Sequence, residues 1–154
     1  MSRKTGVKVV GVNKKARREY EILDTFEAGL VLTGSEVKSL RQGRVSFKDG
    51  YVRFHKEEAF LVGVHIAPYE NAGYAQHDPE RERKLLLHKR EIKSLMGKVE
   101  QKGYTVIPLK IYFKQGKAKV EIGLARGKKL YDLREELKKK TIAREMAREM
   151  AKYK

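Results

Sequence analysis

The sequence predicts a mostly β (α+β) fold: a closed antiparallel β-barrel with two or three short helices, followed by a flexible basic C-terminal tail. About five or six short runs of alternating apolar residues are separated by turn dipeptides such as Asp-Gly and Gln-Gly. Two stretches have helical spacing, and they do not alternate regularly with the strands. We therefore expect a flexible segment over residues 1–8, a barrel domain over 9–126 and a tail over 127–154.

The net charge points to a polyanionic partner. The chain has 154 residues, with 36 Lys and Arg against 20 Asp and Glu, and a formal charge of +16. Residues 1–126 alone hold 26 basic and 15 acidic residues, so the tail does not account for the whole excess. Such an excess favours nucleic acid as the partner, and an anionic membrane surface second.

Several functional classes find no support in the sequence. The chain has no Cys, no apolar run of 18 residues and no N-terminal signal-peptide pattern, so we expect a cytoplasmic protein. The 4 His residues lack metal-ligand spacing, and neither a nucleophile elbow nor a phosphate-binding Gly loop is present. We therefore expect no enzyme activity, no metal site and no cofactor.

The first ordered elements include a basic cluster. Residues 9–12 predict a strand, residues 21–25 a second strand, and residues 27–29 a turn or bulge. Between the two strands, Tyr20 follows a run of polar and basic residues. The cluster comprises Asn13, Lys14, Lys15, Arg17 and Arg18. It is either a solvated turn or a strand edge that binds RNA phosphates, with Tyr20 available to stack on a base.

A short central helix follows an apolar run at residues 30–32. Thr33 and Glu36 have capping-box spacing, Val37 and Leu40 form an apolar edge, and Gly43 ends the helix. Off that edge, three residues are expected to face water: Lys38, Ser39 and Arg41. A helix this short needs a sheet to cover.

The middle of the chain predicts a hairpin and a long loop. Residues 51–56 and 59–66 pair across Glu57-Glu58. One face of the second strand is expected to be apolar, with Phe60, Val62, Val64 and Ile66. The polar loop 68–79 contains Tyr69, Tyr74 and His77, and its length suggests a function. A helical turn should begin at Asp78-Pro79.

The last helix and hairpin are the clearest. Residues 85–87 are three leucines, of which one should be partly exposed, and residues 89–101 form an amphipathic helix that Gly103 ends. In the hairpin that turns at Gln115-Gly116, one face is expected to hold Ile107, Leu109, Ile111, Phe113, Val120, Ile122 and Leu124, and the outer face Lys110, Lys119 and Glu121. Closure of such strands favours an oligonucleotide-binding (OB-like) barrel.

Several linked motifs also resemble one family. The stretch EAGLVLTGSEVKSLR, with NKKAR-x-x-Y before it and RKLLL, KGYTV and ARGKK after it, resembles the SsrA-binding protein (small protein B) family. The resemblance runs from about Val9 to about Lys140 and implies an OB-like barrel. It also implies an adaptor that binds the tRNA-like part of transfer-messenger RNA, acts at stalled ribosomes and works with elongation factor Tu. We expect a monomer.

The expected RNA surface combines both lines of reasoning. Its residues are Asn13, Lys14, Lys15, Arg17, Tyr20, Glu27, Lys38, Arg41, Arg83, Lys84, Leu86 and Lys119. Resemblance places Glu27, Leu86 and Lys119 at family positions involved in RNA contact. A carboxylate beside phosphates should repel them, so the alternative for Glu27 is a turn residue that pairs with a nearby Lys.

The tail is expected to be disordered alone and helical on the ribosome, because favourable and repulsive i,i+4 charge pairs nearly balance. In the family it enters the decoding region of the small subunit, where an anticodon would lie. The expected contacts are Gly127, Lys128, Lys129, Tyr131, Asp132, Arg134, Lys138 and Lys139. Leu133 stands where the family has a Lys, which removes one expected phosphate contact.

Two other functional classes remain open from composition. A ribosomal or ribosome-assembly protein would have the same basic character and would stay in salt-washed particles. A membrane-surface protein would bind anionic vesicles as well as it binds RNA.

Overall fold

The computed structural model describes residues 7–127, apart from the side chain of Ala75. The strands are β1 (Val7–Val12), β2 (Tyr20–Leu30), β3 (Val45–Ser46), β4 (Tyr51–His55), β5 (Glu58–Val62), β6 (His65–Ile66), β7 (Arg83–Leu86), β8 (Thr105–Lys114) and β9 (Lys117–Gly127). The helices are α2 (Ala16–Glu19), α3 (Gly34–Arg41) and α4 (Lys89–Lys102), with a 3₁₀ turn at Gly73–Ala75.

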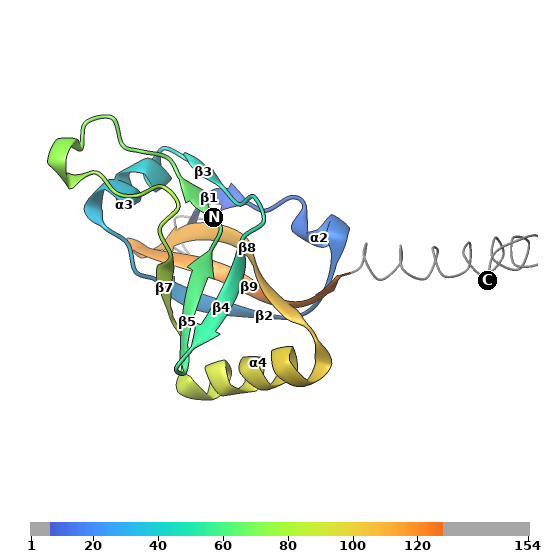
Figure 1. Ribbon diagram of the computed structural model, residues 1–154. Helices are drawn as coiled ribbons and strands as arrows, with labels where there is room; N and C mark the ends of the chain where they lie inside the picture. Colours follow the sequence, from blue (N-terminus) through green and yellow to red (C-terminus); the bar gives the residue numbers. More distant parts are fainter. Residues whose placement is uncertain (1–6, 128–154) are drawn as a thin grey trace, which may run out of the picture.

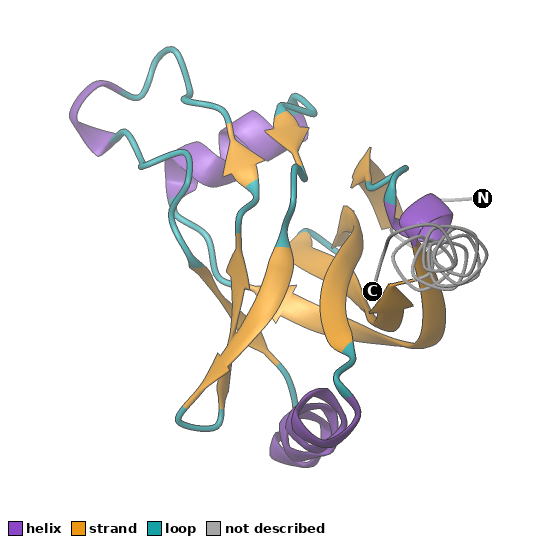
Figure 2. Ribbon diagram, turned by 45° about the vertical axis from the view of Figure 1, so that its right-hand side comes forward, coloured by secondary structure: helices purple, strands orange, loops and turns teal. Residues whose placement is uncertain are grey.

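The strands form one curled antiparallel sheet in the order β1-β8-β9-β2-β7-β5-β4, and a small separate pair, β3-β6. Helices α3 and α4 lie at opposite ends of the curled sheet, with α4 below the strands in the view of Figure 1. Strand β4 comes close to β8 (Figure 2), but no ladder joins them in the described part of the chain. The mostly β fold with few helices is confirmed, whereas closure of the barrel is not.

The main core fills the inside of the curl. Leu40 of α3 and Leu95 of α4 are fully buried, and they meet Ile111 of β8 and Ile122 of β9 in one cluster. Complete burial of each such side chain contributes roughly 1.5–3 kcal/mol to folding. The two helices are therefore held by the sheet, as the shortness of α3 requires.

Helix α3 begins as the sequence predicts. The Thr33 hydroxyl accepts a hydrogen bond from the Glu36 amide at 3.4 Å, and Glu36 Oε1 accepts one from the Thr33 amide at 2.9 Å. One expected position is wrong. Ser39 does not face water; it is fully buried and donates to the carbonyl of Ala67 at 2.6 Å, because the loop after β6 crosses this side of the helix.

Helix α4 and the final hairpin are also confirmed. Gly103 ends α4 in the left-handed region at φ 69°. The turn between β8 and β9 has positive φ at both Gln115 and Gly116, which is typical of the hairpin turn predicted there.

The faces of the hairpin differ from the prediction. A β-bulge in β8 shifts the register between Pro108 and Lys110. Ile107, before the bulge, and Leu109, within it, pack into a second small core with Ala16 and Ala125, while Ile111, after the bulge, lies in the main core. The single apolar face expected for this strand is wrong because an extra residue reverses the alternation of side chains.

Glycine causes a similar change near β5. Gly63 has φ 80° and separates β5 from β6, so Leu61 before it and Val64 after it are both buried, whereas Phe60 and Val62 are half-buried. The single apolar face expected for residues 59–66 is therefore wrong. The turn before β5 falls at Lys56-Glu57, one residue earlier than predicted.

Two further local predictions fail. Residues 27–29 are not a turn but lie inside the continuous strand β2, whose register shift falls instead between Ile22 and Asp24. Asp78-Pro79 forms a turn, closed by the Arg81 amide on the Asp78 carbonyl at 3.1 Å, and no helix follows it.

Candidate nucleic-acid interface

The register of three neighbouring strands, β9, β2 and β7, brings three predicted residues together on the outer face of the sheet. Lys119 of β9 lies opposite Gly29 of β2, and Gly29 lies opposite Leu86 of β7. Glu27 is two residues before Gly29 and so shares its face. The neighbouring Ala28 points into the main core. We call Glu27, Lys84, Leu86 and Lys119, together with Tyr112 and Lys114 of β8, the Glu27 patch.

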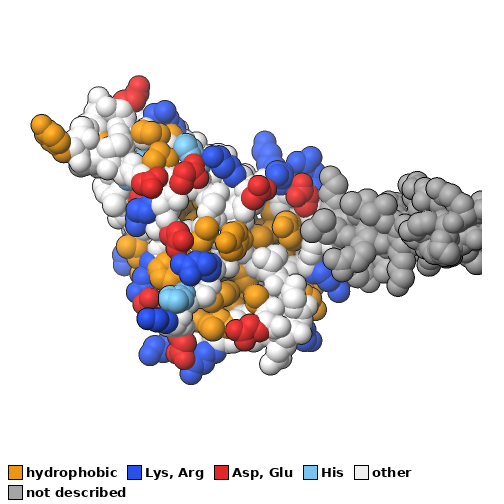
Figure 3. Space-filling view, in the orientation of Figure 1, with side chains coloured by type: hydrophobic (Ala, Val, Ile, Leu, Met, Phe, Trp, Pro, Cys, Tyr) orange, Lys and Arg blue, Asp and Glu red, His pale blue; other side chains and the backbone are white. Residues whose placement is uncertain are grey.

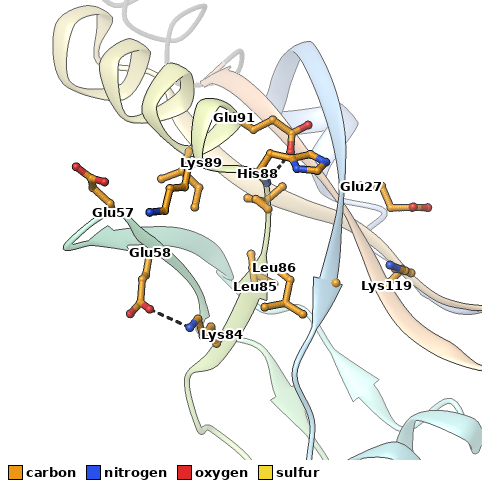
Figure 4. Close-up of a pocket in the computed structure, with 13 residues that line it drawn as sticks. Glu27, Glu57, Glu58, Lys84, Leu85, Leu86, His88, Lys89, Glu91 and Lys119 are labelled. Atoms are coloured by element: carbon orange, nitrogen blue, oxygen red, sulfur yellow. Dashed lines mark hydrogen bonds and ion pairs between the residues drawn. The ribbon is translucent and has the colours of Figure 1, made fainter.

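A groove of about 500 Å³ runs along the Glu27 patch. Figure 4 shows Glu27 and Lys119 on one side of Leu86, and the first turn of α4 with His88 above it. Leu86 is 56% exposed, although the two leucines beside it are covered more. A Cβ added to Gly29 would lie 3.2 Å from the Leu86 side chain, so the missing side chain at Gly29 leaves room for Leu86.

Glu27 is held by two residues of β8. The Tyr112 hydroxyl donates to Glu27 Oε2 at 2.5 Å, and Lys114 Nζ lies 3.5 Å from the same oxygen. The hydrogen bond from Tyr112, with help from the charges of Lys114 and Lys119, holds the pKa of Glu27 below its ordinary value despite partial burial. Glu27 is therefore a carboxylate at neutral pH. It lies beside one hydroxyl donor, Tyr112, and two cations, Lys114 and Lys119.

Lys84 reaches the same groove from the other side. Its ammonium lies 2.9 Å from the Glu58 carboxylate, and both side chains are exposed (Figure 4). Because exposed ion pairs are weak, Lys84 can leave Glu58 for a phosphate at little cost.

The N-terminal basic cluster lies elsewhere. Lys14, Lys15 and Arg17 are exposed around α2, and Figure 3 shows basic side chains gathered over this helix. Asn13 has a structural role, since its side-chain amide donates to the Pro108 carbonyl at 2.8 Å. Tyr20 is half-buried against the second core, so only part of its ring is available.

Strand β2 separates the two groups. Tyr20 and Glu27 lie on it, and seven residues of extended chain span about 23 Å. The single continuous surface expected from the sequence is therefore two sets of exposed residues at different positions along the same strand.

The two basic residues expected on α3 are exposed and lie against aromatic rings. Lys38 Nζ is 5.6 Å from the centre of the Tyr69 ring, and the Arg41 guanidinium is 4.6 Å from that of Phe113. Such cation–π contacts orient both cations without neutralising them.

The expected surface position of Arg83 is wrong. Its side chain is fully buried, with Nε donating to Glu36 Oε2 at 2.8 Å and Nη1 to the Val64 carbonyl at 2.7 Å. Arg81 donates to both oxygens of the same carboxylate, at 3.1 and 2.6 Å. Arg83 therefore joins β7 to α3 and to the segment between β5 and β6, instead of facing RNA.

Burial and mutual contacts shift the pKa values of all three residues in this ion-pair network, Glu36, Arg81 and Arg83. Burial raises the pKa of Glu36, but hydrogen bonds from Arg81 and the Thr33 amide, and the charge of Arg83, leave that pKa below its ordinary value. Burial lowers the pKa of the Arg83 guanidinium, while the hydrogen bond to Glu36 raises that of Arg81.

The loop after β6 is also anchored by a buried histidine. The Ser35 hydroxyl and His77 Nδ1 are 2.8 Å apart, and His77 Nε2 is 2.9 Å from the Ile66 carbonyl. Tyr74, at the tip of the loop, is fully exposed. The sequence suggested a functional loop here but gave no sign that His77 would be a buried anchor.

Sequence reasoning missed Tyr112 and the partners of Glu36. Tyr112 sits between two apolar residues of a predicted strand, and its outward position was visible from the alternation of side chains. Its contact with Glu27 could not be found without the order of the strands.

The tail predictions concern residues that the structure does not describe. Gly127 is the last described residue and pairs with Tyr20 at the end of β9. The remaining expected contacts, Lys128, Lys129, Tyr131, Asp132, Arg134, Lys138 and Lys139, lie outside the described residues.

Residues 7–127 lack two features that other functional classes need. They contain no group of three or more His, Asp or Glu side chains placed to hold a metal ion. No helix among them combines the length and apolar character needed to cross a bilayer.

Comparison with known proteins gives consistent matches. A family model described as "SmpB protein" matches residues 10–152. The SsrA-binding protein of Solidesulfovibrio magneticus is 63% identical over 152 residues, covering 99% of each chain. That of Aquifex aeolicus is 60% identical over 141 residues, covering 91% of this chain and 90% of its own. A solved structure described as "tmRNA-SmpB: a journey to the center of the bacterial ribosome" contains a chain 58% identical to this one, with a TM-score of 0.66, covering 77% of this chain and 83% of that one.

Proposed function

Because the chain belongs to the SmpB protein family, we propose that it is the RNA-binding adaptor of trans-translation. In this role it binds the tRNA-like domain of transfer-messenger RNA and delivers that RNA to stalled ribosomes. The observation that carries the proposal is the likeness, at 58% identity, to a chain of a structure described by the words tmRNA-SmpB and bacterial ribosome.

The described surface supports an RNA partner. Residues 1–126 have 26 basic and 15 acidic residues, and the exposed cations lie around α2, on α3 and in the Glu27 patch. Folded RNA is recognised mainly through phosphates, 2′-hydroxyls and unpaired bases, because its deep groove hides the base edges. Exposed Lys and Arg suit the phosphates, while Leu86 and Glu27 suit an unpaired base.

Further parts of the proposal extend the family role. The protein acts as a cytoplasmic monomer without enzyme activity, and it works with elongation factor Tu. Its C-terminal residues act in the decoding region of the small subunit in place of codon–anticodon pairing. The curl that brings β4 close to β8 supports an OB-like barrel for the RNA-binding domain.

Sequencing the RNA that co-purifies with the tagged protein tests this function. The proposal predicts one abundant transfer-messenger RNA, together with loss of the protein from ribosomes after a high-salt wash. Ribosomal RNA alone, with the protein retained in washed particles, would instead identify a ribosomal or ribosome-assembly protein.

A further inference from the structure

Tyr112 and Glu27 meet across an intervening strand. Tyr112 of β8 lies opposite Lys119 of β9, and Glu27 of β2 lies opposite Glu121 of β9. Strands β8 and β2 are two spacings apart, about 10 Å. The phenol must therefore lie along the sheet over β9 to reach Glu27, which explains why Tyr112 is only 7% exposed although its strand position faces outward.

This contact leaves the two oxygens of Glu27 in different situations. Both partners, the Tyr112 hydroxyl at 2.5 Å and Lys114 Nζ at 3.5 Å, contact Oε2. No residue within 7–127 donates a hydrogen bond to Oε1, and the Glu27 side chain is 39% exposed. One oxygen is held, and the other is available to a ligand in the groove beside Leu86.

We propose that Tyr112 is a positioning residue for RNA recognition, and that it fixes the Glu27 carboxylate so that Oε1 accepts a hydrogen bond from an amino or imino group of an unpaired RNA base. The inference rests on the proposed function, in which the RNA is the tRNA-like domain of transfer-messenger RNA. A carboxylate is the acceptor that suits the amino group of cytosine, and unpaired bases present such groups on their open edges.

Lys114 cannot hold the carboxylate in this way. The Lys114–Glu27 pair is exposed, at 43% and 39%, and exposed pairs are weak and poorly ordered. A hydroxyl that donates to a carboxylate forms a short, directional bond and leaves the negative charge in place. Burial and the bond to Glu27 both raise the pKa of Tyr112, so the hydroxyl keeps its proton at neutral pH.

The arrangement also resolves the charge conflict at Glu27. Lys114 and Lys119 both lower the pKa of Glu27 through their charges, and the same charges reduce its repulsion of nearby phosphates. A carboxylate can therefore sit in an RNA-binding surface, where it selects a base donor without excluding the backbone.

A double-mutant cycle tests the inference. Affinity for the isolated tRNA-like domain is measured for wild type, Tyr112→Phe, Glu27→Gln and the double variant. We expect Tyr112→Phe to bind about tenfold more weakly, since a hydrogen bond to a charged group is lost. In the Glu27→Gln background the same change should cost less than about twofold. Tyr104→Phe, at a half-buried tyrosine packed on the main core, is the matched control and should bind like wild type.

A second readout separates positioning from a structural role. The Glu27 carboxyl is titrated by NMR in the RNA-free protein, where Tyr112→Phe should raise its midpoint because the largest cause of the lowered pKa is removed. Wild-type RNA affinity for Tyr112→Phe, or an equal loss in both Glu27 backgrounds, overturns the inference and leaves the proposed function standing. If the wild-type protein binds an elongator tRNA as tightly as it binds the tRNA-like domain, that result overturns the proposed function, and the inference with it.

Discussion

Replacement of Glu36 by Gln should destabilise the protein strongly. The carboxylate is fully buried and accepts hydrogen bonds from Arg81, from Arg83 and from the amide of Thr33. Gln keeps the shape but loses the charge, and its amide group would face guanidinium donors. The buried Arg83 would then lack its counter-charge, at 0% exposure.

The expected loss follows from the burial of Arg83. Removing one partner of a buried ion pair typically costs about 3–5 kcal/mol, because the other charge is left uncompensated. For a chain of this size that corresponds to a fall in Tm of roughly 6–20 °C. Urea unfolding followed by circular dichroism measures the change in the free energy of unfolding, and calorimetry measures the Tm.

The difference between the variant and wild type should depend on pH. The pKa of Glu36 in the folded protein lies below its ordinary value of 4.5. Its ionisation therefore stabilises the fold fully above about pH 4.5, and the contribution is lost as the pH falls through the folded pKa. The stability gap between wild type and Glu36→Gln should be constant near neutral pH and shrink in acid.

Glu82→Gln is the control, since Glu82 pairs with Arg53 at the surface, at 2.6 Å. It should leave the Tm unchanged within error. The reasoning is refuted if Glu36→Gln unfolds at the wild-type Tm, or if its deficit is the same at pH 3 and pH 7.

Three further predictions concern RNA and the ribosome. With about five to eight phosphate contacts, a plot of log affinity for the tRNA-like domain against log salt should have a slope of roughly −4 to −7, and a slope near zero would contradict phosphate binding. Leu86→Ala should weaken RNA binding about tenfold with an unchanged Tm, whereas Leu23→Ala, another exposed leucine, should bind normally; equal effects would show that Leu86 is ordinary surface. Truncation after Arg126 should keep most RNA binding and abolish peptide tagging on stalled ribosomes, and a variant that still tags would disprove the role of the tail.

Local signals in the sequence were sufficient for individual elements. Thr33 and Glu36 predicted the start of α3 because a capping box needs only residues three apart. Gln115-Gly116 predicted its hairpin turn for the same reason, since the positive φ angles are set within the turn. Glu27, Leu86 and Lys119 could also be expected on one surface. That expectation came from the resemblance to the family, because the pairing of their strands could not be read from the sequence.

Features that depend on more distant parts of the chain could not be predicted. The bulge at Pro108–Lys110 and the break at Gly63 each reverse which side chains are buried, and alternation alone cannot locate them. The burial of Arg83 depends on Glu36, which is 47 residues away in the sequence. The basic residues of the sequence therefore predicted one RNA-binding surface, although one of them, Arg83, belongs to a buried ion pair.

The delivery of transfer-messenger RNA to stalled ribosomes tests the account most directly. Ribosomes stalled at the end of a truncated message are incubated with transfer-messenger RNA, with or without this protein, and the RNA in the ribosomal fraction is measured after sedimentation. We predict that the RNA enters the ribosomal fraction only when the protein is present, and that Glu27→Gln reduces this transfer. Equal amounts of RNA on the ribosomes with and without the protein would contradict the proposed adaptor function.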